Sequence, residues 1–375
     1  TAPEPPRRFV LCLVADDEAV ERFPEAVRFL QVGLIDEPID VILVVPQRGR
    51  ARSLAIGSTV VIPYRKAQWP FDRWARRQLI DRACETIDGF KAEAGRIVHA
   101  LSVSAAPPAS AIASAAGADL VVTVSAPAAL HDPRALRWLT GAAALAAPAE
   151  AIRREANDSP LASKRVEVIP PGIMAGESPA AFRNPDEAPT LLFAGELTAA
   201  TGVDILLRAV ERVLRRRPDL QLFLLGKGPA EAGLRSLAAA LKITSNVTFA
   251  GRLDEQRRAM EAADLFCIPR AVPVYREEPL QAMAAGLAIV SAEGTLCEGL
   301  VDRQTAFFFP DGSAAELADR LVLLLERPET ARTLAATAQA FVRSHHALAG
   351  MVGAFLRLYR DLIGRHETLP LPPRR

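Results

Sequence analysis

Short apolar runs alternate with helix-like segments along most of the chain. The runs are rich in valine and isoleucine and are bounded by Gly, Pro or Asp, which is typical of β-strands. Most are apolar at every position rather than at every second one, so they predict strands buried on both faces, as in a parallel sheet covered by helices. In the first half the predicted strands are residues 9–14, 40–45, 59–62, 96–100, 119–124, 142–146 and 166–169. Helical patterns between them, such as 71–92 and 147–156, indicate a doubly wound α/β domain.

The second half repeats this alternation. Its predicted strands are residues 191–193, 220–225, 247–250, 265–268, 288–291 and 306–309. A helix with one apolar face begins near Val203 and ends before Pro218, and further helices are predicted at 314–325, 329–342 and 351–363. The sequence therefore predicts a second α/β domain of the same kind.

A segment between the halves breaks the pattern and divides the chain into domains. Residues 173–189 hold several prolines and charges and little periodicity, which is typical of a linker. The predicted division is a disordered tail at 1–8, a first domain at 9–172, the linker at 173–189, a second domain at 190–345, a last helix at 346–366 and a tail at 367–375.

Composition narrows the class of protein. Half of the 375 residues are hydrophobic and the net charge is +1, so we expect a globular protein of about two domains and no nucleic-acid partner. The four cysteines lie far apart without metal-ligand spacing, which predicts no metal site and a reducing compartment. No apolar run reaches about 18 residues, and the N-terminus lacks a signal-peptide pattern. We therefore predict a cytoplasmic location and no transmembrane segment.

Glycines in a recurring order mark the second half. Gly195-Glu196 follows the first strand there, and Thr201-Gly202 precedes the first helix. Leu224-Leu225-Gly226-Lys227-Gly228-Pro229 follows the second strand, and a glycine and an arginine, Gly251-Arg252, follow the third. The series ends in a helical segment, Leu280-Gln281-Ala282-Met283-Ala284-Ala285-Gly286.

This series resembles the donor half of the family-4 retaining glycosyltransferases. The first half is similar to that family at 96–100 (RIVHA), 119–124 (DLVVTV) and 166–172 (VEVIPPG), and the second also at 291–312. The resemblance implies the α/β GT-B fold, with two Rossmann-like domains facing a central cleft and a C-terminal helix that crosses back to the first domain. It implies transfer of a sugar, with retention, from a nucleoside-diphosphate sugar and without a divalent metal.

Four polar positions depart from that family. The family has an arginine and a lysine on the diphosphate and two glutamates in a Glu-x7-Glu motif; this chain has Glu196, Thr201, Pro273 and Gln281 at the corresponding positions. Glu196 would repel a diphosphate and Thr201 carries no charge. Pro273 offers neither a carboxylate nor an N–H, whereas Gln281 keeps the hydrogen bonding needed for a ribose.

The first domain departs in the same way. The family's histidine after the Val-Thr-Val strand is Ser125, and the second histidine of its His-Ala-His strand is Leu101. We expect His99, which remains, to be a core histidine with satisfied hydrogen bonds. The acids that follow Ala15, Asp16-Asp17-Glu18, replace a glycine loop and are expected to cap the next helix.

The candidate donor site therefore has a backbone frame and few charges. No catalytic residue is assigned, since the family's positions hold Ser125, Pro273 and Gln281. Lys227 and Arg252, at strand ends, either compensate for the lost cations or have surface roles. The candidate binding residues are Gly195, Glu196, Thr201, Gly226, Lys227, Gly228, Gly251, Arg252 and Gln281.

Two functions from different classes follow. The first is a retaining glycosyltransferase that takes a nucleotide sugar and a small-molecule, glycan or lipid-linked acceptor, with peripheral membrane contact. The second is a non-catalytic pseudo-glycosyltransferase that acts as a scaffold, ligand sensor or partner subunit of another protein. A related GT-B epimerase or phosphorylase is a third alternative, for which the sequence offers no specific residues.

Overall fold

The computed structural model divides the chain into two compact units. It describes residues 8–47, 55–57, 59–65, 73–90, 92–184, 186–251 and 256–367. The first unit holds the chain up to Gly172 and again from Leu348, and the second unit holds Ile173–Ala347. The last helix, α13 (Leu348–Glu367), therefore belongs to the first unit although it follows the second in sequence.

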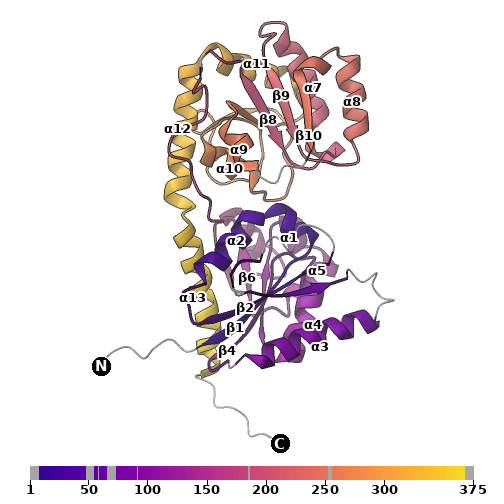
Figure 1. Ribbon diagram of the computed structural model, residues 1–375, viewed down its shortest axis with the longest axis vertical. Helices are drawn as coiled ribbons and strands as arrows, with labels where there is room; N and C mark the ends of the chain where they lie inside the picture. The colour runs from indigo at the N-terminus through magenta and orange to yellow at the C-terminus, as the bar shows by residue number, and fades with distance from the viewer. Residues whose placement is uncertain are drawn as a thin grey trace, which may run out of the picture. The chain divides into compact units, whose positions relative to one another are not determined.

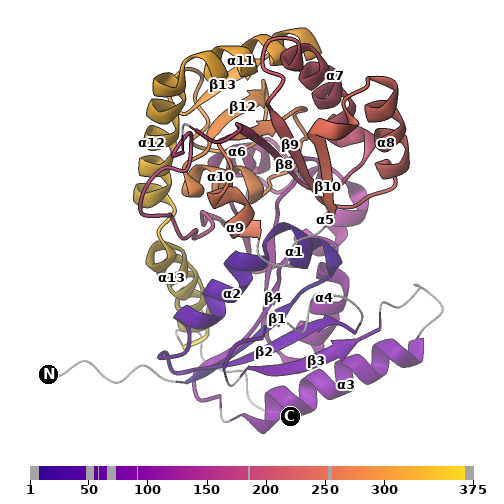
Figure 2. The same ribbon diagram turned by 45° about the horizontal axis from the view of Figure 1, so that its top comes forward.

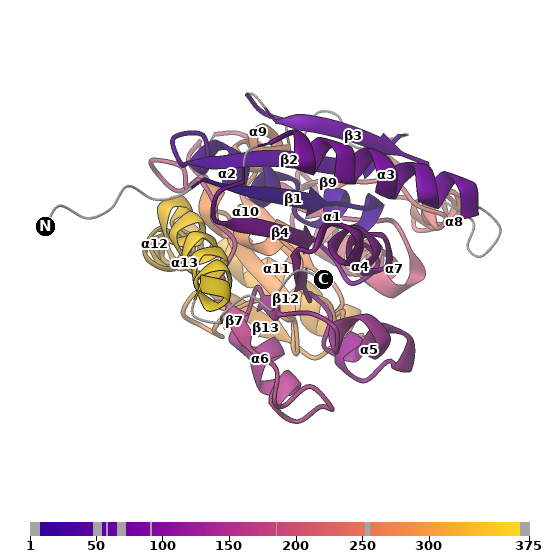
Figure 3. The same ribbon diagram turned by 90° about the horizontal axis from the view of Figure 1, so that it is seen from below.

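The first unit is built on a parallel sheet. Its seven strands, counted over the described residues, have the order β3-β2-β1-β4-β5-β6-β7. Figure 3 shows β3, β2, β1 and β4 side by side in this order. The strands are β1 (Phe9–Val14), β2 (Ile39–Pro46), β3 (Val60–Tyr64), β4 (Gly95–Ala100), β5 (Asp119–Thr123), β6 (Ala144–Ala147) and β7 (Val166–Val168).

Helices cover both faces of this sheet, which explains why its inner strand β1 is apolar and buried at every position. Phe9, Leu11 and Leu13 of β1 belong to a core shared with α2 (Pro24–Gly33) and α13. On the other side of the strands lie α3 (Arg73–Gly89) and α4 (Ala106–Ala116) (Figure 1). The shorter helices of this unit are α1 (Asp17–Arg22), α5 (Pro133–Leu139) and α6 (Glu150–Asn157).

Close packing attaches α13 to the first unit. A Cβ added at Gly33 of α2 would lie 2.4 Å from Cγ2 of Val352 in α13, so only glycine permits this helix crossing. The buried side chains of Leu358, Tyr359 and Leu362 extend the contact into the core. The predicted return of the C-terminal helix to the first domain is confirmed.

The second unit has a parallel sheet of six strands within the described residues. Their order is β10-β9-β8-β11-β12-β13. They are β8 (Thr190–Ala194), β9 (Gln221–Leu225), β10 (Val247–Gly251), β11 (Leu265–Ile268), β12 (Ala288–Ala292) and β13 (Ala306–Phe309). The predicted α/β class, with two Rossmann-like domains, is confirmed.

The helices of the second unit also lie on both sides of its sheet. Figure 2 shows α8 (Glu231–Ala240) on the opposite side of β8 from α9 (Gln256–Glu261) and α10 (Glu278–Ala285). The core on one face joins β8, β9, β11 and β12 to α7 (Val203–Leu214), α11 (Ala314–Glu326) and α12 (Pro328–His345). Short 3-10 turns, η2 (Pro127–Leu130), η3 (Ala199–Thr201) and η4 (Thr244–Asn246), lie in loops.

The segment predicted as a linker packs against the second unit. Ala181 and Phe182 are buried in its core, and the N–H of Phe182 donates a hydrogen bond to the Asp264 carboxylate at 2.6 Å. A second contact lies at the end of α10, where Gly286 (φ +75°) meets Pro179. Residues 173–184 are thus part of the second unit's packing.

Several helices were not assigned from the sequence, and α4 shows one reason. Pro107 and Pro108 interrupt the pattern at 106–116, yet α4 begins there. Both prolines lie in its first turn, where the missing N–H would have no partner within the helix. Among the described residues no helix combines the length and apolar character needed to span a membrane.

Substituting Gly286 by alanine should lower the free energy of unfolding by about 1–3 kcal/mol, the range for a strained backbone position. The new Cβ would sit in the left-handed region and 2.4 Å from Cα of Pro179. Urea denaturation measures the change. The control is Gly233→Ala in α8, where nothing lies within 4 Å of the new Cβ. It should instead stabilise by roughly 0.5–1 kcal/mol. Equal effects at the two positions would contradict this packing.

Candidate functional site

In the second sheet, the order in which successive strands are added reverses between β8 and β11. From β8 the chain continues to β9 and β10 on one side, whereas β11, β12 and β13 extend the sheet on the other. Loops leaving the carboxyl ends of β8 and β11 therefore separate and leave a crevice, which is where open parallel sheets bind ligands. The order of the strands alone thus places a candidate site at this edge.

A pocket of about 400 Å³ lies at this switch point. Its apolar wall comes from Phe193 and Ala194 of β8 and from Phe266 and Cys267 of β11. Its polar side chains are few and come from the surrounding loops and the start of α10: Thr201, Arg270, Arg276, Glu278 and Thr295. An apolar pocket with a few convergent polar groups is typical of small-molecule sites.

The Arg276 guanidinium lies directly against Gly195. A Cβ at Gly195 would stand 2.0 Å from Nη2 of Arg276, so the glycine leaves the space that the guanidinium fills. Nη2 also donates to the Ala194 carbonyl at 3.4 Å, and the guanidinium forms a two-pronged ion pair with Glu278 at 2.8 and 3.3 Å. Burial disfavours the charged form of Arg276, but Glu278 and Glu196 outweigh burial and raise its pKa.

Arg270 is the second cation of the pocket and has no acidic partner among the described residues. Its Nε is buried and donates no hydrogen bond within that part of the chain. Its Cβ packs against Gly202 (φ +71°), which precedes the first turn of α7. An unpaired guanidinium beside a helix N-terminus gives this pocket a net attraction for anions.

The four residues that replace the family's charged groups differ in burial and in hydrogen bonding. Glu196 and Pro273 are exposed, and Thr201 is buried. The Thr201 hydroxyl donates to the carbonyls of Glu196 and Thr198, both at 2.9 Å, and so holds the loop before α7. Gln281 is only 9% exposed, and its Oε1 accepts no hydrogen bond from any described residue.

The glycines of the predicted site hold loops together. A Cβ at Gly226 would lie 1.8 Å from the Gly195 carbonyl oxygen, and one at Gly228 would lie 2.2 Å from that of Leu197. The loops after β8 and β9 therefore touch backbone to backbone. These two glycines are required by this packing whether or not a ligand binds.

Lys227 and Gly251 of the predicted site lie near the end of β10. Lys227 is exposed, and its Cε lies 3.3 Å from where a Cβ at Gly251 would be. Arg252 lies outside the described residues, so the structure places Lys227 alone of the two predicted compensating cations. The switch-point pocket has its own cations instead.

In the first unit the predicted roles of His99 and Asp16 are confirmed. His99 is fully buried, with Nδ1 2.8 Å from the Tyr359 hydroxyl and Nε2 2.8 Å from that of Thr123. Burial lowers the pKa of His99 to about 3, so the ring is neutral at ordinary pH. Asp16 Oδ1 accepts from the Ala19 N–H and caps α1, and Ser125 is buried.

Sequence reasoning missed Arg270 and Arg276. Both arginines lie outside the positions where the family has charged groups, so the resemblance gave no reason to expect a cation at either. The sequence signal that could have found them is their position. Arg270 lies two residues after β11 and Arg276 lies two residues before α10, so both belong to the loop at the carboxyl end of β11. Within the described residues no cluster of His, Cys, Asp and Glu could hold a metal ion.

Comparison with known sequences locates the family resemblance in the second unit. Residues 188–327 match the sequence model of the family described as glycosyl transferases group 1. This range contains the switch-point pocket, and it confirms the resemblance there.

The curated relatives match about half of the chain. A phosphatidyl-myo-inositol mannosyltransferase from Mycobacterium tuberculosis is 31% identical over 216 residues, 54% of this chain and 56% of that protein. A D-inositol 3-phosphate glycosyltransferase from Stackebrandtia nassauensis is 32% identical over 235 residues, 55% of this chain and 51% of that protein. The chain spans about half the length of these relatives.

Solved structures match almost the whole chain. Anabaena HepE in complex with UDP and glucose has a TM-score of 0.74 at 15% identity, covering 96% of this chain and 100% of that one. Sucrose-phosphate synthase from Thermosynechococcus elongatus has a TM-score of 0.75 at 17% identity with the same coverage. The predicted GT-B fold is thereby confirmed.

His99 should make stability depend on pH in an acidic window. Its folded pKa of about 3 lies below the ordinary value of 6.5, so the unfolded chain binds the extra proton between these values. Stability from this group is complete above pH 6.5 and falls by up to about 1.4 kcal/mol per pH unit below it. Chemical denaturation from pH 7 to pH 4 should show a shallower decline for His99→Gln than for the parent.

His345→Gln is the control, since His345 is exposed. An unchanged decline in His99→Gln would show that His99 is protonated in the folded protein.

Proposed function

We propose that this protein, which has the GT-B fold and a group 1 glycosyltransferase domain in its second unit, is a retaining glycosyltransferase that uses a nucleoside-diphosphate sugar. The observation that carries the proposal is the switch-point pocket with Arg270 unpaired and Arg276 at the end of β8. A diphosphate brings about two negative charges. The guanidiniums of Arg270 and Arg276 would balance these two charges, although they stand at other sequence positions than the family's cations.

The arginines suit a diphosphate geometrically as well as by charge. A guanidinium presents N–H donors in a planar fork that matches two phosphate oxygens. Arg270 can offer this fork at once, whereas Arg276 must first exchange Glu278 for a phosphate. Glu278 lies in the first turn of α10, where the helix dipole stabilises its charge after the exchange.

Gln281 supports a place for the rest of the nucleotide. Its Oε1 is buried and lacks a donor within the described residues, which is costly unless a ligand supplies one. A ribose hydroxyl is such a donor. Retention rests on the family resemblance, and the arginines would stabilise the charge on the departing diphosphate.

The acceptor proposed is lipid-linked. One relative is named for mannosyl transfer to phosphatidyl-myo-inositol, which carries acyl chains. Such an acceptor would bring the protein to a membrane surface, in accord with the predicted peripheral contact.

A second candidate function is a non-catalytic sensor of the same ligand, with a protein partner. One observation favours it: exposed Pro273 stands where the family has a glutamate that contacts the sugar, and it cannot replace that carboxylate. A transfer assay separates the two functions. Release of the nucleoside diphosphate together with a glycosylated acceptor supports the enzyme, and tight donor binding without product supports the sensor.

Arg270→Ala and Arg276→Ala should each weaken binding of UDP, GDP or ADP by about 10- to 100-fold, because each removes a charge-assisted contact worth about 1.5–3 kcal/mol. Glu278→Gln should tighten binding, because it frees Arg276. Isothermal titration calorimetry measures all three variants. Arg215→Ala is the control, since Arg215 forms a similar ion pair with Glu211 at an exposed position. Equal affinities across the set would refute the site.

Transfer should also proceed at an unchanged rate in the presence of EDTA, because the proposal assigns the phosphate charges to arginine and requires no metal. The measurement is the rate of product formation before and after chelation, with added Mg²⁺ as the reverse test. A rate that disappears with EDTA and returns with Mg²⁺ would contradict the metal-independent mechanism.

A further inference from the structure

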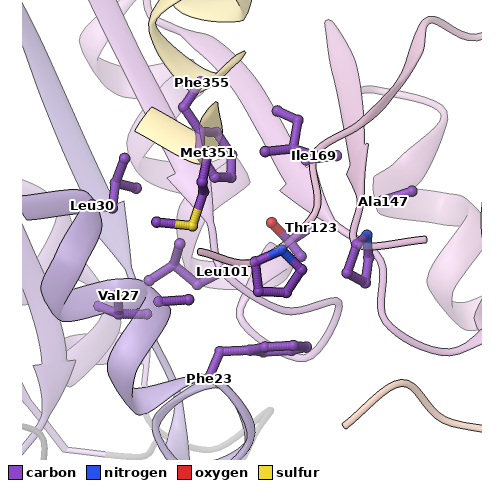
Figure 4. Close-up of a pocket in the computed structure, with 13 residues that line it drawn as sticks. Phe23, Val27, Leu30, Leu101, Thr123, Ala147, Ile169, Met351 and Phe355 are labelled. Carbon is purple, nitrogen blue, oxygen red and sulfur yellow. The ribbon is translucent and has the colours of Figure 1, made fainter. Parts of the chain in front are cut away.

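The first unit contains a pocket of about 490 Å³ that none of the candidate binding residues lines. Segments that lie far apart in the sequence form its walls (Figure 4). Phe23, Val27 and Leu30 come from the region of α2, and Met351 and Phe355 come from α13. The N–H of Gly172 donates to Sδ of Met351 at 3.0 Å, which fixes that side chain in the wall.

The pocket lies where a parallel sheet binds ligands. Leu101, Thr123, Ala147 and Ile169 lie at or just after the carboxyl ends of β4, β5, β6 and β7 and line it. Open α/β sheets bind ligands at this edge. The position of the pocket therefore favours a ligand site over an accidental gap in packing.

The lining excludes a polar ligand. Among the described residues that line the pocket, Thr123 alone has a polar side chain, and its hydroxyl is engaged by Nε2 of neutral His99. A hydroxyl or charged group placed here would lose its water without gaining a partner, which is costly. Apolar cavities of this kind stay dry and bind hydrocarbons.

The depth of the pocket favours a narrow ligand. Leu30, Met351 and Leu101 are only 2%, 3% and 6% exposed, so the recess lies below the surface. A flat protein face could not reach these side chains, whereas a flexible alkyl chain can enter.

We infer that this pocket binds the hydrocarbon chain of an amphipathic ligand, and that in the reaction this ligand is the acceptor. The acceptor role rests on the proposed function, whereas the hydrocarbon site does not depend on it. The chain would anchor the acceptor on the first unit, while its polar head stays outside the pocket.

The test uses alkyl β-glucosides with chains of four to ten carbons, below their micelle-forming concentrations, and the full-length protein. Calorimetry should show affinity rising about fourfold per added methylene until the pocket is full, with no binding of glucose. Equal binding of glucose and of the alkyl glucosides would overturn the inference, and so would the absence of any binding.

Two variants localise the effect. Ala26→Leu adds volume at the pocket wall on α2 and should abolish the chain-length dependence; Ala232→Leu makes the same change at an exposed position of α8 and should not. Val27→Ala enlarges the pocket and should move the best chain length upward, so the inference can still be tested if Ala26→Leu misfolds. Variants that bind as the parent does would overturn it. UDP, GDP and ADP titrations on the same samples test the donor site separately.

Discussion

The second unit depends on a backbone contact that only glycine allows. The loop after β9 runs so close to the loop after β8 that a single carbon added at Gly226 would meet the carbonyl oxygen of Gly195 at 1.8 Å. This contact sets the path of both loops at the carboxyl edge of the sheet. It therefore determines where Gly195 presents an open surface, and the Arg276 guanidinium lies on that surface.

This backbone contact distinguishes the residues that the fold requires from those that a ligand would require. Gly226 and Gly228 are required by packing, so they are expected in any chain with these loops. Charged side chains that bind a phosphate are not required by this packing, so they can occur at other positions in the sequence. In this chain two cations, Arg270 and Arg276, line the pocket although Glu196 is acidic. Loss of the family's charges at their usual positions therefore still leaves cations at this edge of the sheet.

The sequence predicted the fold better than the site. Apolar runs with turn residues at their ends located the strands, because burial on both faces leaves a signal within each run. The path of the loop between β11 and α10 has no such signal, since it depends on packing among Gly195, Gly202 and the strand ends. Spacing alone could not bring Arg270 and Arg276 into one pocket. The core role of His99 was predictable, but its partner Tyr359, 260 residues away, was not.

The two proposed sites differ in chemistry: the pocket proposed for the donor has charged side chains, and the pocket proposed for the acceptor's chain is apolar. The most direct test of the central claim is a crystal structure of the protein soaked with UDP, GDP or ADP. If the two arginines bind the donor, diphosphate density will lie between the ends of β8 and β11, with Arg270 and Arg276 both within hydrogen-bonding distance and Glu278 displaced. A bound diphosphate that leaves the Arg276–Glu278 pair intact and touches neither arginine would contradict it.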